Sequence, residues 1–298
     1  MSVFVGLDCG GSSSRVMAVD AMGKILYQGH SGAANLVSTP ESRVRRNLTH
    51  ASRGCPPPQF VCGCFAGLIN DEVRTRGIEH LREVFPGAAL RAEPDYTAAF
   101  YASPPGTDIC VISGTGSLVC SRKDGEIVKS GGRGFILGDE GSSYQYGRDA
   151  IRHFIRDPEQ CSEFLREALL EHFGSLDSST VTAAVYRAPT PATLLSRFSR
   201  ALGQDAVAGE PYALKSLEIN TAELAETVFE HAHHYLDPQR TLTISLAGGL
   251  WKASPIFRER FAAALRARLD VEELVVTRIA RPPLYGAVEL AKEMGIGN

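Results

Sequence analysis

The chain has 298 residues, which at roughly 150 residues per domain predicts two domains. Its formal charge at pH 7 is −3, and 22% of its residues are charged. This composition is typical of a globular protein and gives no support for a nucleic acid as its main partner. The 29 glycines exceed the average usage of about 7%, and the excess predicts tight turns or close approaches of the backbone.

We expect neither a membrane-spanning segment nor a signal peptide. No apolar run approaches the ~20 residues of a membrane-spanning helix, and residues 1–6 have neither a basic start nor a signal-peptide cleavage site. Seven cysteines are an odd and modest number, unlike the disulfide framework of a short secreted protein. We therefore expect a reduced, cytoplasmic protein that binds no membrane. We expect Cys62 and Cys64 to be core residues, because two further zinc ligands at suitable spacing do not follow them.

The first predicted elements form a hairpin around a glycine-rich turn. Residues 3–7 are apolar and of strand length, Asp8 follows, and residues 9–13 (CGGSS) form the turn. Residues 15–19 and 25–28 then predict two more strands. This turn joins strand to strand, whereas the P-loop and the dinucleotide-binding fingerprint join strand to helix, and neither motif is present.

The next segment alternates helices and strands. Ser38, with Glu41 three residues later, is typical of a capping box and predicts a helix start. Residues 60–65 and 88–92 predict strands, so this segment indicates an α/β fold. Asp95 follows the second of these strands and has two interpretations. It either caps the next helix or points into a cleft between lobes and accepts the proton of an attacking hydroxyl.

The hairpin pattern then recurs. Residues 109–113 predict a strand, residues 114–117 (GTGS) a turn, and residues 118–121 and 126–129 two more strands. The recurrence indicates an internal duplication in which each copy begins one lobe.

The Pro- and Gly-containing segment 103–107 is the candidate boundary between the lobes. We expect a first lobe of residues 1–106, completed by a C-terminal helix at about 281–298, and a second lobe of residues 107–280.

Residues 144–236 predict mostly helix, which makes them a helical insert in the second lobe. His231, His233 and His234 lie near its end, and we expect a solvated helix end there rather than a metal site. A strand at 242–246 follows, and then Gly248 and Gly249.

Three glycine-containing segments are candidates for binding a nucleotide. Backbone N–H groups and hydroxyls in turns such as 10–13 and 114–117 can hold phosphate oxygens. A carboxylate beside such a turn, as at Asp8, can hold Mg²⁺ through water. Gly248 and Gly249 let a flat ring or a ribose lie against the backbone.

The densest glycine segment is residues 131–142, GGRGFILGDEGS. One interpretation is a long surface loop. The other is a cleft wall, in which Asp139 accepts hydrogen bonds from substrate hydroxyls and the glycines let the backbone come close.

Six motifs occur in a specific order and spacing: LDCGGSSSR, GAANL, PDYTAA, ISGTGS, GGRGFILGDEGS and AGGLWKAS. On these motifs the chain resembles the sugar-kinase branch of the actin/hexokinase superfamily. It is most similar to the N-acetylglucosamine and bacterial glucosamine kinases, within the wider family of benzoyl-CoA-reductase-type ATPases. The resemblance implies an α/β fold of two ribonuclease H-like (actin-like ATPase) lobes with an interlobe cleft and a helical insert in the second lobe.

The resemblance also implies the ligands, ATP and Mg²⁺ as cofactors and a sugar as substrate. It makes Asp95 the catalytic base and places Asp8 near the metal. The implied ATP contacts are Asp8, Gly10, Gly11, Ser12, Thr115, Gly248 and Gly249, with Trp251 and Lys252 just beyond. The implied sugar contacts are Asn35, Asp95, Ser117, Gly132, Arg133 and Asp139.

Two departures from the pattern bear on the substrate. N-acetylglucosamine kinases have Asn where this chain has Leu118, and Trp where it has Arg133, whereas glucosamine kinase has Arg at the second position. An Arg would repel a protonated amine, so if Arg133 faces the sugar, an anionic or neutral substituent is easier to explain. We expect ATP-dependent phosphorylation of an amino sugar or related hexose at C6, by a homodimer.

Two alternatives remain at this point. One is an ATPase that drives electron transfer, as in the dehydratase activators of the same wider family, whose cysteines hold an iron–sulfur cluster between subunits. Cys110 lies one residue from such a position, and no second ligand is evident. The other is a sugar sensor without catalysis. Related sensors carry an extra DNA-binding domain, for which Val3, already in the first strand, leaves no room.

Overall fold

The computed structural model describes residues 2–238 and 240–296. The chain divides into two compact units. The first combines Met1–Pro105 with Ile279–Asn298, and the second is Gly106–Arg278. The chain therefore leaves the first unit once and returns to it at its C-terminal end.

The first unit is built on a five-stranded sheet in the order β3-β2-β1-β4-β5. Strands β1, β4 and β5 are parallel, and β2 and β3 continue from β1 as an antiparallel hairpin. The strands are β1 (Val3–Cys9), β2 (Ser13–Asp20), β3 (Ile25–Gly32), β4 (Phe60–Phe65) and β5 (Ala89–Pro94). The helices that follow them are α1 (Glu41–Ala51), α2 (Asp71–Val84) and α3 (Asp95–Tyr101).

The two faces of this sheet are covered by different helices. Alternate residues of β1, from Val3 to Cys9, pack in the same hydrophobic cluster as residues of α1 and α2. The other face packs against α3 and the C-terminal helix α12 (Pro283–Ile296). Gly6 allows this packing, because a Cβ there would overlap the backbone at Ala287 and Val288. Helix α12 therefore lies directly on β1, the strand that ends in Asp8 and Cys9.

The second unit repeats the arrangement of the first. Its sheet has the order β10-β9-β6-β7-β8, with β6, β9 and β10 parallel and β7 and β8 forming the antiparallel hairpin. Its strands are β6 (Ile109–Ser113), β7 (Ser117–Lys123), β8 (Glu126–Gly131), β9 (Thr241–Ala247) and β10 (Glu273–Arg278). Because β6 to β8 correspond to β1 to β3, and β9 and β10 to β4 and β5, the predicted duplication is confirmed.

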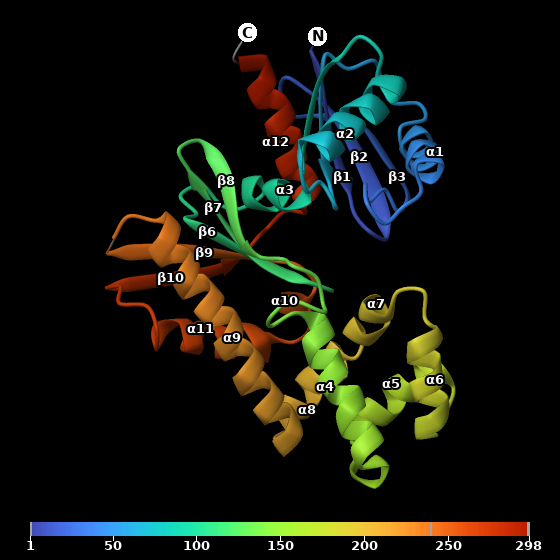
Figure 1. Cartoon of the computed structure of the whole chain (residues 1–298). Helices are drawn as coiled ribbons and strands as arrows, with labels where there is room; N and C mark the ends of the chain where they lie inside the picture. The colour runs from blue at the N-terminus through green and yellow to red at the C-terminus, as the bar shows by residue number, and fades with distance from the viewer. Residues whose placement is uncertain (1, 239, 297–298) are drawn as a thin grey trace. The chain divides into compact units, whose positions relative to one another are not determined.

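The second unit also carries the helical insert, and most of the insert's apolar side chains join one core with the sheet. Its α-helices are α4 (Ser143–Arg156), α5 (Glu163–Phe173), α6 (Ser178–Arg187), α7 (Pro191–Ser196), α8 (Ser199–Ala208) and α9 (Pro211–Tyr235). A short 3-10 helix spans Pro158–Gln160, and α10 (Leu250–Ala253) and α11 (Pro255–Arg266) follow β9. The predicted fold, two ribonuclease H-like α/β units with a helical insert in the second, is confirmed (Figure 1).

Two local predictions were wrong. The capping box at Ser38 is not formed, because α1 begins at Glu41 with Pro40 as its N-cap residue, and the Ser38 N–H donates to Asn35 instead. His231 is not at a solvated helix end. It is fully buried, while its neighbours His233 and His234 are exposed as expected.

None of the helices in the described part of the chain combines the length and the apolar run that crossing a bilayer requires.

Candidate active site

In the first unit, the predicted site residues lie at the carboxyl end of the parallel strands. Asp8 is next to last in β1, and Asp95 directly follows the last residue of β5. Both carboxylates influence the pKa of the buried Cys9 thiol. Burial is the main cause that raises its pKa, and the charges of Asp8 and then Asp95 raise it further. The two carboxylates therefore lie at one edge of the sheet, where ligands of α/β proteins bind.

Asp95 occupies the first turn of α3, but it is not the N-cap residue. Pro94 holds that position. The structure therefore does not place Asp95 at the N-cap, and its role as the catalytic base stays a prediction.

Asp8 is half-buried, and its electrostatics reflect this. Burial raises the pKa of its carboxyl above the ordinary value, and the charge of Arg15, its partner across the β1–β2 pair, acts in the opposite direction. A divalent cation beside Asp8 would favour the ionised form in the same way as Arg15 does.

Asn35 is held at the same edge by the chain around it. The N–H of Ala34 donates to the carbonyl of Gly10 at 3.1 Å, and the N–H of Leu36 donates to the carbonyl of Ala66 at 3.0 Å. Its own side-chain Oδ1 accepts from Val37 and Ser38 at 2.8 and 2.9 Å. Its Nδ2 group has no hydrogen-bond partner among the described residues and can donate to a ligand.

In the second unit, the second glycine turn lies against the start of the glycine-rich loop. Ser113 and Ser117 flank the turn, and their hydroxyls donate to the carbonyls of Gly141 and Glu140 at 2.9 and 2.7 Å. The N–H of Ser143, at the start of α4, donates to the carbonyl of Gly114 at 2.8 Å. These hydrogen bonds fix the turn, the glycine-rich loop and the start of α4 to each other.

Asp139 belongs to this arrangement. Its side chain is buried, with 7% exposed, and its backbone is left-handed with φ of 62°. Burial raises its pKa, while hydrogen bonds from the N–H groups of Ser117 and Gly134 lower it. A Cβ at Gly116 would lie 2.7 Å from Asp139 Oδ2, so the glycine lets this carboxylate approach the turn. The carboxylate is therefore fixed against the turn rather than free in solvent.

The end of β9 lies beside the same turn. Strand β9 pairs with β6 up to Ala247 and Ile112, so the residues after each strand are neighbours. Gly248 has φ of 107°, and a Cβ there would overlap the carbonyl of Ser113. Gly249 has open space on its Cβ side. Gly248 is thus explained by backbone packing, and Gly249 by room for something outside the chain.

The structure places the other predicted site residues as follows. Gly11 and Ser12 are exposed at the tip of the first turn, and Thr115 is exposed at the tip of the second. Arg133 is exposed, and a Cβ at the adjacent Gly132 would lie 3.2 Å from the Cβ of Leu118, so the two departures from the family pattern belong to neighbouring chain segments.

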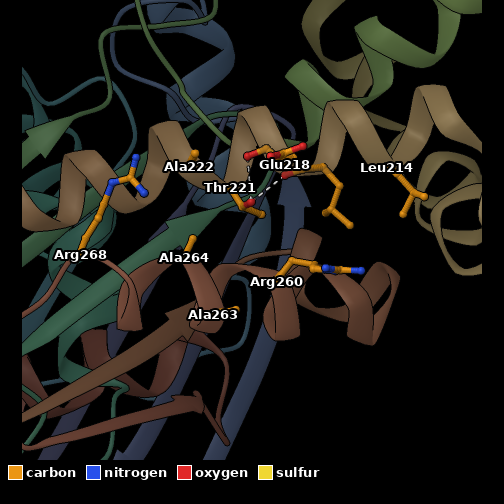
Figure 2. A pocket seen from close by; sticks show the side chains of 9 residues that line it. Leu214, Glu218, Thr221, Ala222, Arg260, Ala263, Ala264 and Arg268 are labelled. Carbon is orange, nitrogen blue, oxygen red and sulfur yellow. Dashed lines mark hydrogen bonds between the residues drawn. The ribbon is translucent and has the colours of Figure 1, made fainter.

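A large hollow lies away from these residues. It holds about 530 Å³ between α9 and α11, and none of the predicted site residues lines it. Figure 2 shows the side chains that line it, which come from these two helices and from Arg268 just after α11. Its lining is Leu214, Leu217, Glu218, Thr221, Ala222, Arg260, Ala263, Ala264 and Arg268.

The model of the BadF/BadG/BcrA/BcrD ATPase family matches residues 88–290, more than half of the chain. The chain belongs to this ATPase family.

Relatives and solved structures extend the similarity to the whole chain. An N-acetylmuramic acid/N-acetylglucosamine kinase of Clostridium acetobutylicum is 22% identical, over 98% of this chain and 99% of its own length. A glucosamine kinase of Vibrio cholerae is 25% identical, over 86% and 90%. The structure of a candidate N-acetylglucosamine kinase from Chromobacterium violaceum superimposes with a TM-score of 0.72 at 23% identity, covering 98% of this chain and 99% of that one.

The sequence analysis did not predict two contacts of the second turn. The first is the start of α4, where Ser142 is the N-cap residue and accepts from Gln145 N–H. The S-x-x-Q pattern at 142–145 is a capping-box signal that predicts this start. The second is the Ser196 hydroxyl, 3.5 Å from that of Thr115. Ser196 lies in α7, and no local pattern connects it with the turn.

Trp251 also differs from what its position suggested. Its ring is buried and packs on Phe261, so this side chain belongs to the core of the second unit. Gly249, not Trp251, is the member of this segment with open space beside it.

Proposed function

We propose that the protein is an ATP-dependent kinase that phosphorylates a hydroxyl of an amino sugar or related hexose, at C6. The observation that carries the proposal is the second-unit site, where Asp139 is held against the 114–117 turn and Gly249, after the end of β9, lies beside that turn. A buried carboxylate suited to hydroxyl groups next to a turn suited to phosphates is what a sugar kinase requires. The names of the similar kinases support the same substrate class.

The phosphates of ATP are assigned to the two glycine turns. The N–H of the exposed Gly11 and the hydroxyls of Ser12 and Thr115 would supply donors for phosphate oxygens. The N–H of Gly10 donates to the Ser13 carbonyl at 2.8 Å and closes the first turn, so Gly10 would contact ATP through its backbone atoms other than this N–H. The adenosine is assigned to Gly248 and Gly249, where the second has open space.

The residues present fit Mg²⁺ bound in the way that kinases bind it. Among the described residues, no three His, Cys, Asp or Glu side chains form a cluster that could hold a metal by themselves. Mg²⁺ in kinase sites is usually held by one or two carboxylates together with substrate phosphates, and Asp8 supplies such a carboxylate beside the first turn. When bound, Mg²⁺ would neutralise phosphate charge during transfer.

The sugar is assigned to Asn35, Asp95, Ser117, Gly132, Arg133 and Asp139. The free Nδ2 group of Asn35 would donate to a hydroxyl. Asp139, ionised, would accept from one or two others. Asp95 would accept the proton of the attacking sugar hydroxyl while the hydroxyl oxygen bonds to the γ-phosphorus of ATP and the bond between that phosphorus and ADP breaks. In such transfers positioning and charge neutralisation supply most of the rate, and a base adds roughly 10²–10⁴-fold.

The activator-type alternative is not favoured. Cys110 is fully buried within β6, where a second subunit cannot reach its thiol to share an iron–sulfur cluster.

The first test is a panel assay of ADP release with glucosamine, N-acetylglucosamine, N-acetylmuramic acid, N-acetylmannosamine and glucose. We expect turnover with at least one amino sugar well above the rate with water alone. The kinase proposal is rejected if no sugar in the panel raises ADP release above the rate without sugar.

The second test is Asp95→Asn. We expect kcat to fall by about 10²–10⁴-fold with little change in the Kd of the sugar, because the amide keeps the size but cannot take the proton. Asp71→Asn is the matched control, since Asp71 is also the first residue of a helix and is exposed. A near-normal kcat in Asp95→Asn would show that Asp95 is not the catalytic base.

A further inference from the structure

A second cavity lies within the helical insert, between α4 and α9. Its volume is about 320 Å³, within the range of roughly 300–1,000 Å³ of small-molecule pockets. Each helix contributes residues spaced i, i+3, i+4 and i+7, which form one face of a helix. The lining is Asp149, Arg152, His153 and Arg156 from α4, and Tyr212, Lys215, Ser216 and Ile219 from α9. None of these residues is assigned to ATP or sugar.

Three of the lining side chains are cations without a counter-charge. Arg152, Arg156 and Lys215 are exposed, and none of them has an ion pair or a hydrogen bond to another described residue. Arg152 and Arg156 are one helical turn apart, and like charges at this spacing repel each other. Lys215 adds a third positive charge from the facing helix. The fold thus brings together three positive charges that it does not neutralise.

The one carboxylate in the cavity is already engaged. Asp149 Oδ1 lies 3.3 Å from Arg148 Nη2. Its Oδ2 accepts from the Ser216 hydroxyl at 2.8 Å and from the Asn220 amide at 3.1 Å. Because Arg148 compensates this charge and is not part of the lining, the cavity keeps a net positive charge.

The remaining aromatic groups are fixed by other partners. The rings of His153 and Tyr212 are stacked, with centroids 3.8 Å apart and planes 6° from parallel. The Tyr212 hydroxyl donates to Asp205, and His153 Nε2 lies 3.4 Å from the carbonyl of Gln160. This pair forms a rigid wall, and the groups left to receive a ligand are the two guanidinium groups and the ammonium group.

We propose that the α4–α9 cavity binds a phosphate dianion, either free or as the phosphate group of a small sugar ester. Guanidinium groups bind phosphate oxygens in a forked, bidentate manner, and an ammonium group adds a point charge. A dianion would offset most of the positive charge in the cavity, and the volume leaves space for a small group attached to the phosphate. The inference stands on this cavity alone and does not depend on the proposed kinase activity.

The test is titration calorimetry of the full-length chain with inorganic phosphate and, separately, with glucose 6-phosphate. We expect saturable binding to the wild type. Arg152→Gln and Lys215→Gln should each weaken it tenfold or more. Arg187→Gln should change it less than twofold. Arg187 is the matched control, because it is an exposed arginine of the same insert, on α6, and lies outside the cavity lining. Circular dichroism melts confirm that each variant is folded.

The two titrations distinguish the source of the phosphate. Tighter binding of glucose 6-phosphate supports a sugar ester, and equal binding supports recognition of the phosphate group alone. The proposal is overturned if wild type shows no saturable binding at millimolar phosphate. It is also overturned if Arg152→Gln and Lys215→Gln bind like Arg187→Gln, since the phosphate would then bind elsewhere, for example at the glycine turns.

Discussion

At the scale of single residues, the glycines of the candidate site have two different physical roles. Gly116 and Gly248 make room for parts of the protein itself, the Asp139 carboxylate and the Ser113 carbonyl. Gly11 and Gly249 have nothing within 4 Å of a Cβ position. The first pair therefore holds the site together, and the second pair leaves open space in which a ligand could lie.

This distinction is testable at the adjacent glycines of β9's end. Gly248→Ala forces a side chain into a left-handed backbone and against the Ser113 carbonyl, so we expect the free energy of unfolding to fall by at least about 2 kcal/mol. Gly249 has helical dihedrals and open space on its Cβ side. We therefore expect Gly249→Ala to change the free energy of unfolding by less than about 1 kcal/mol and to raise the KM for ATP.

Chemical denaturation and steady-state kinetics measure the two effects separately. If Gly249→Ala loses as much stability as Gly248→Ala, or if Gly248→Ala is as stable as wild type, the division of roles is wrong.

At the scale of elements, His231 connects the long helix α9 to the second sheet. Its Nδ1 lies 2.8 Å from the Ser130 hydroxyl on β8, and its Nε2 lies 2.9 Å from the Ser121 hydroxyl on β7. A neutral imidazole has one donor and one acceptor, which two hydroxyls can satisfy. Burial, with a smaller contribution from His234, lowers the pKa of His231 to about 4, so the folded protein keeps it neutral.

This lowered pKa makes the docking of α9 sensitive to acid. Below about pH 6.5 the histidine of the unfolded chain gains a proton, whereas the folded chain does not until about pH 4. The unfolded state therefore binds more protons in this window, and stability falls as the pH falls. Between pH 7 and pH 5 we expect wild type to lose about 2 kcal/mol more than His231→Asn, because the variant lacks this titration.

Urea unfolding of both proteins at pH 7, 6 and 5 measures the difference. Carboxyl groups titrate in both proteins and cancel in the comparison. Parallel pH profiles for wild type and His231→Asn would contradict the role assigned to His231. His233→Asn is the control, since His233 is exposed on the same helix.

The elements also show how far local sequence determines the result. Both hairpins and most strands follow from apolar runs and glycine turns, which act over a few residues. The prediction of a capping box at Ser38 is wrong because Pro40 is the N-cap residue of α1 and the Ser38 N–H donates to Asn35. The burial of His231 was missed because Ser121 and Ser130 reach it only through the sheet. Contacts between distant segments carry no local signal, and Thr115 with Ser196 is a further example.

At the scale of the whole chain, the two units differ in how the sequence supplies their cores. The second unit is continuous, Gly106–Arg278, and its cluster of buried side chains comes from that segment alone. The first unit takes part of its core from α12. Leu284, Ala287, Val288, Leu290 and Ala291 pack there with residues of β1, β2 and β4. Folding of the first unit therefore depends on the last residues of the chain.

This dependence predicts the behaviour of three fragments. Residues 106–278 should fold alone and unfold cooperatively, because their core is complete. Residues 1–105 should not, since the sheet face around Met17, Cys62 and Cys64 would be uncovered, and a large exposed apolar face favours aggregation. Residues 1–105 joined to 279–298 by a flexible Gly/Ser linker should regain a cooperative transition, because α12 restores the missing layer. Thermal melts by circular dichroism and amide dispersion in NMR spectra measure all three. A cooperative, well-dispersed 1–105 fragment, or an unfolded 106–278 fragment, would show that the division of the core differs from the one described.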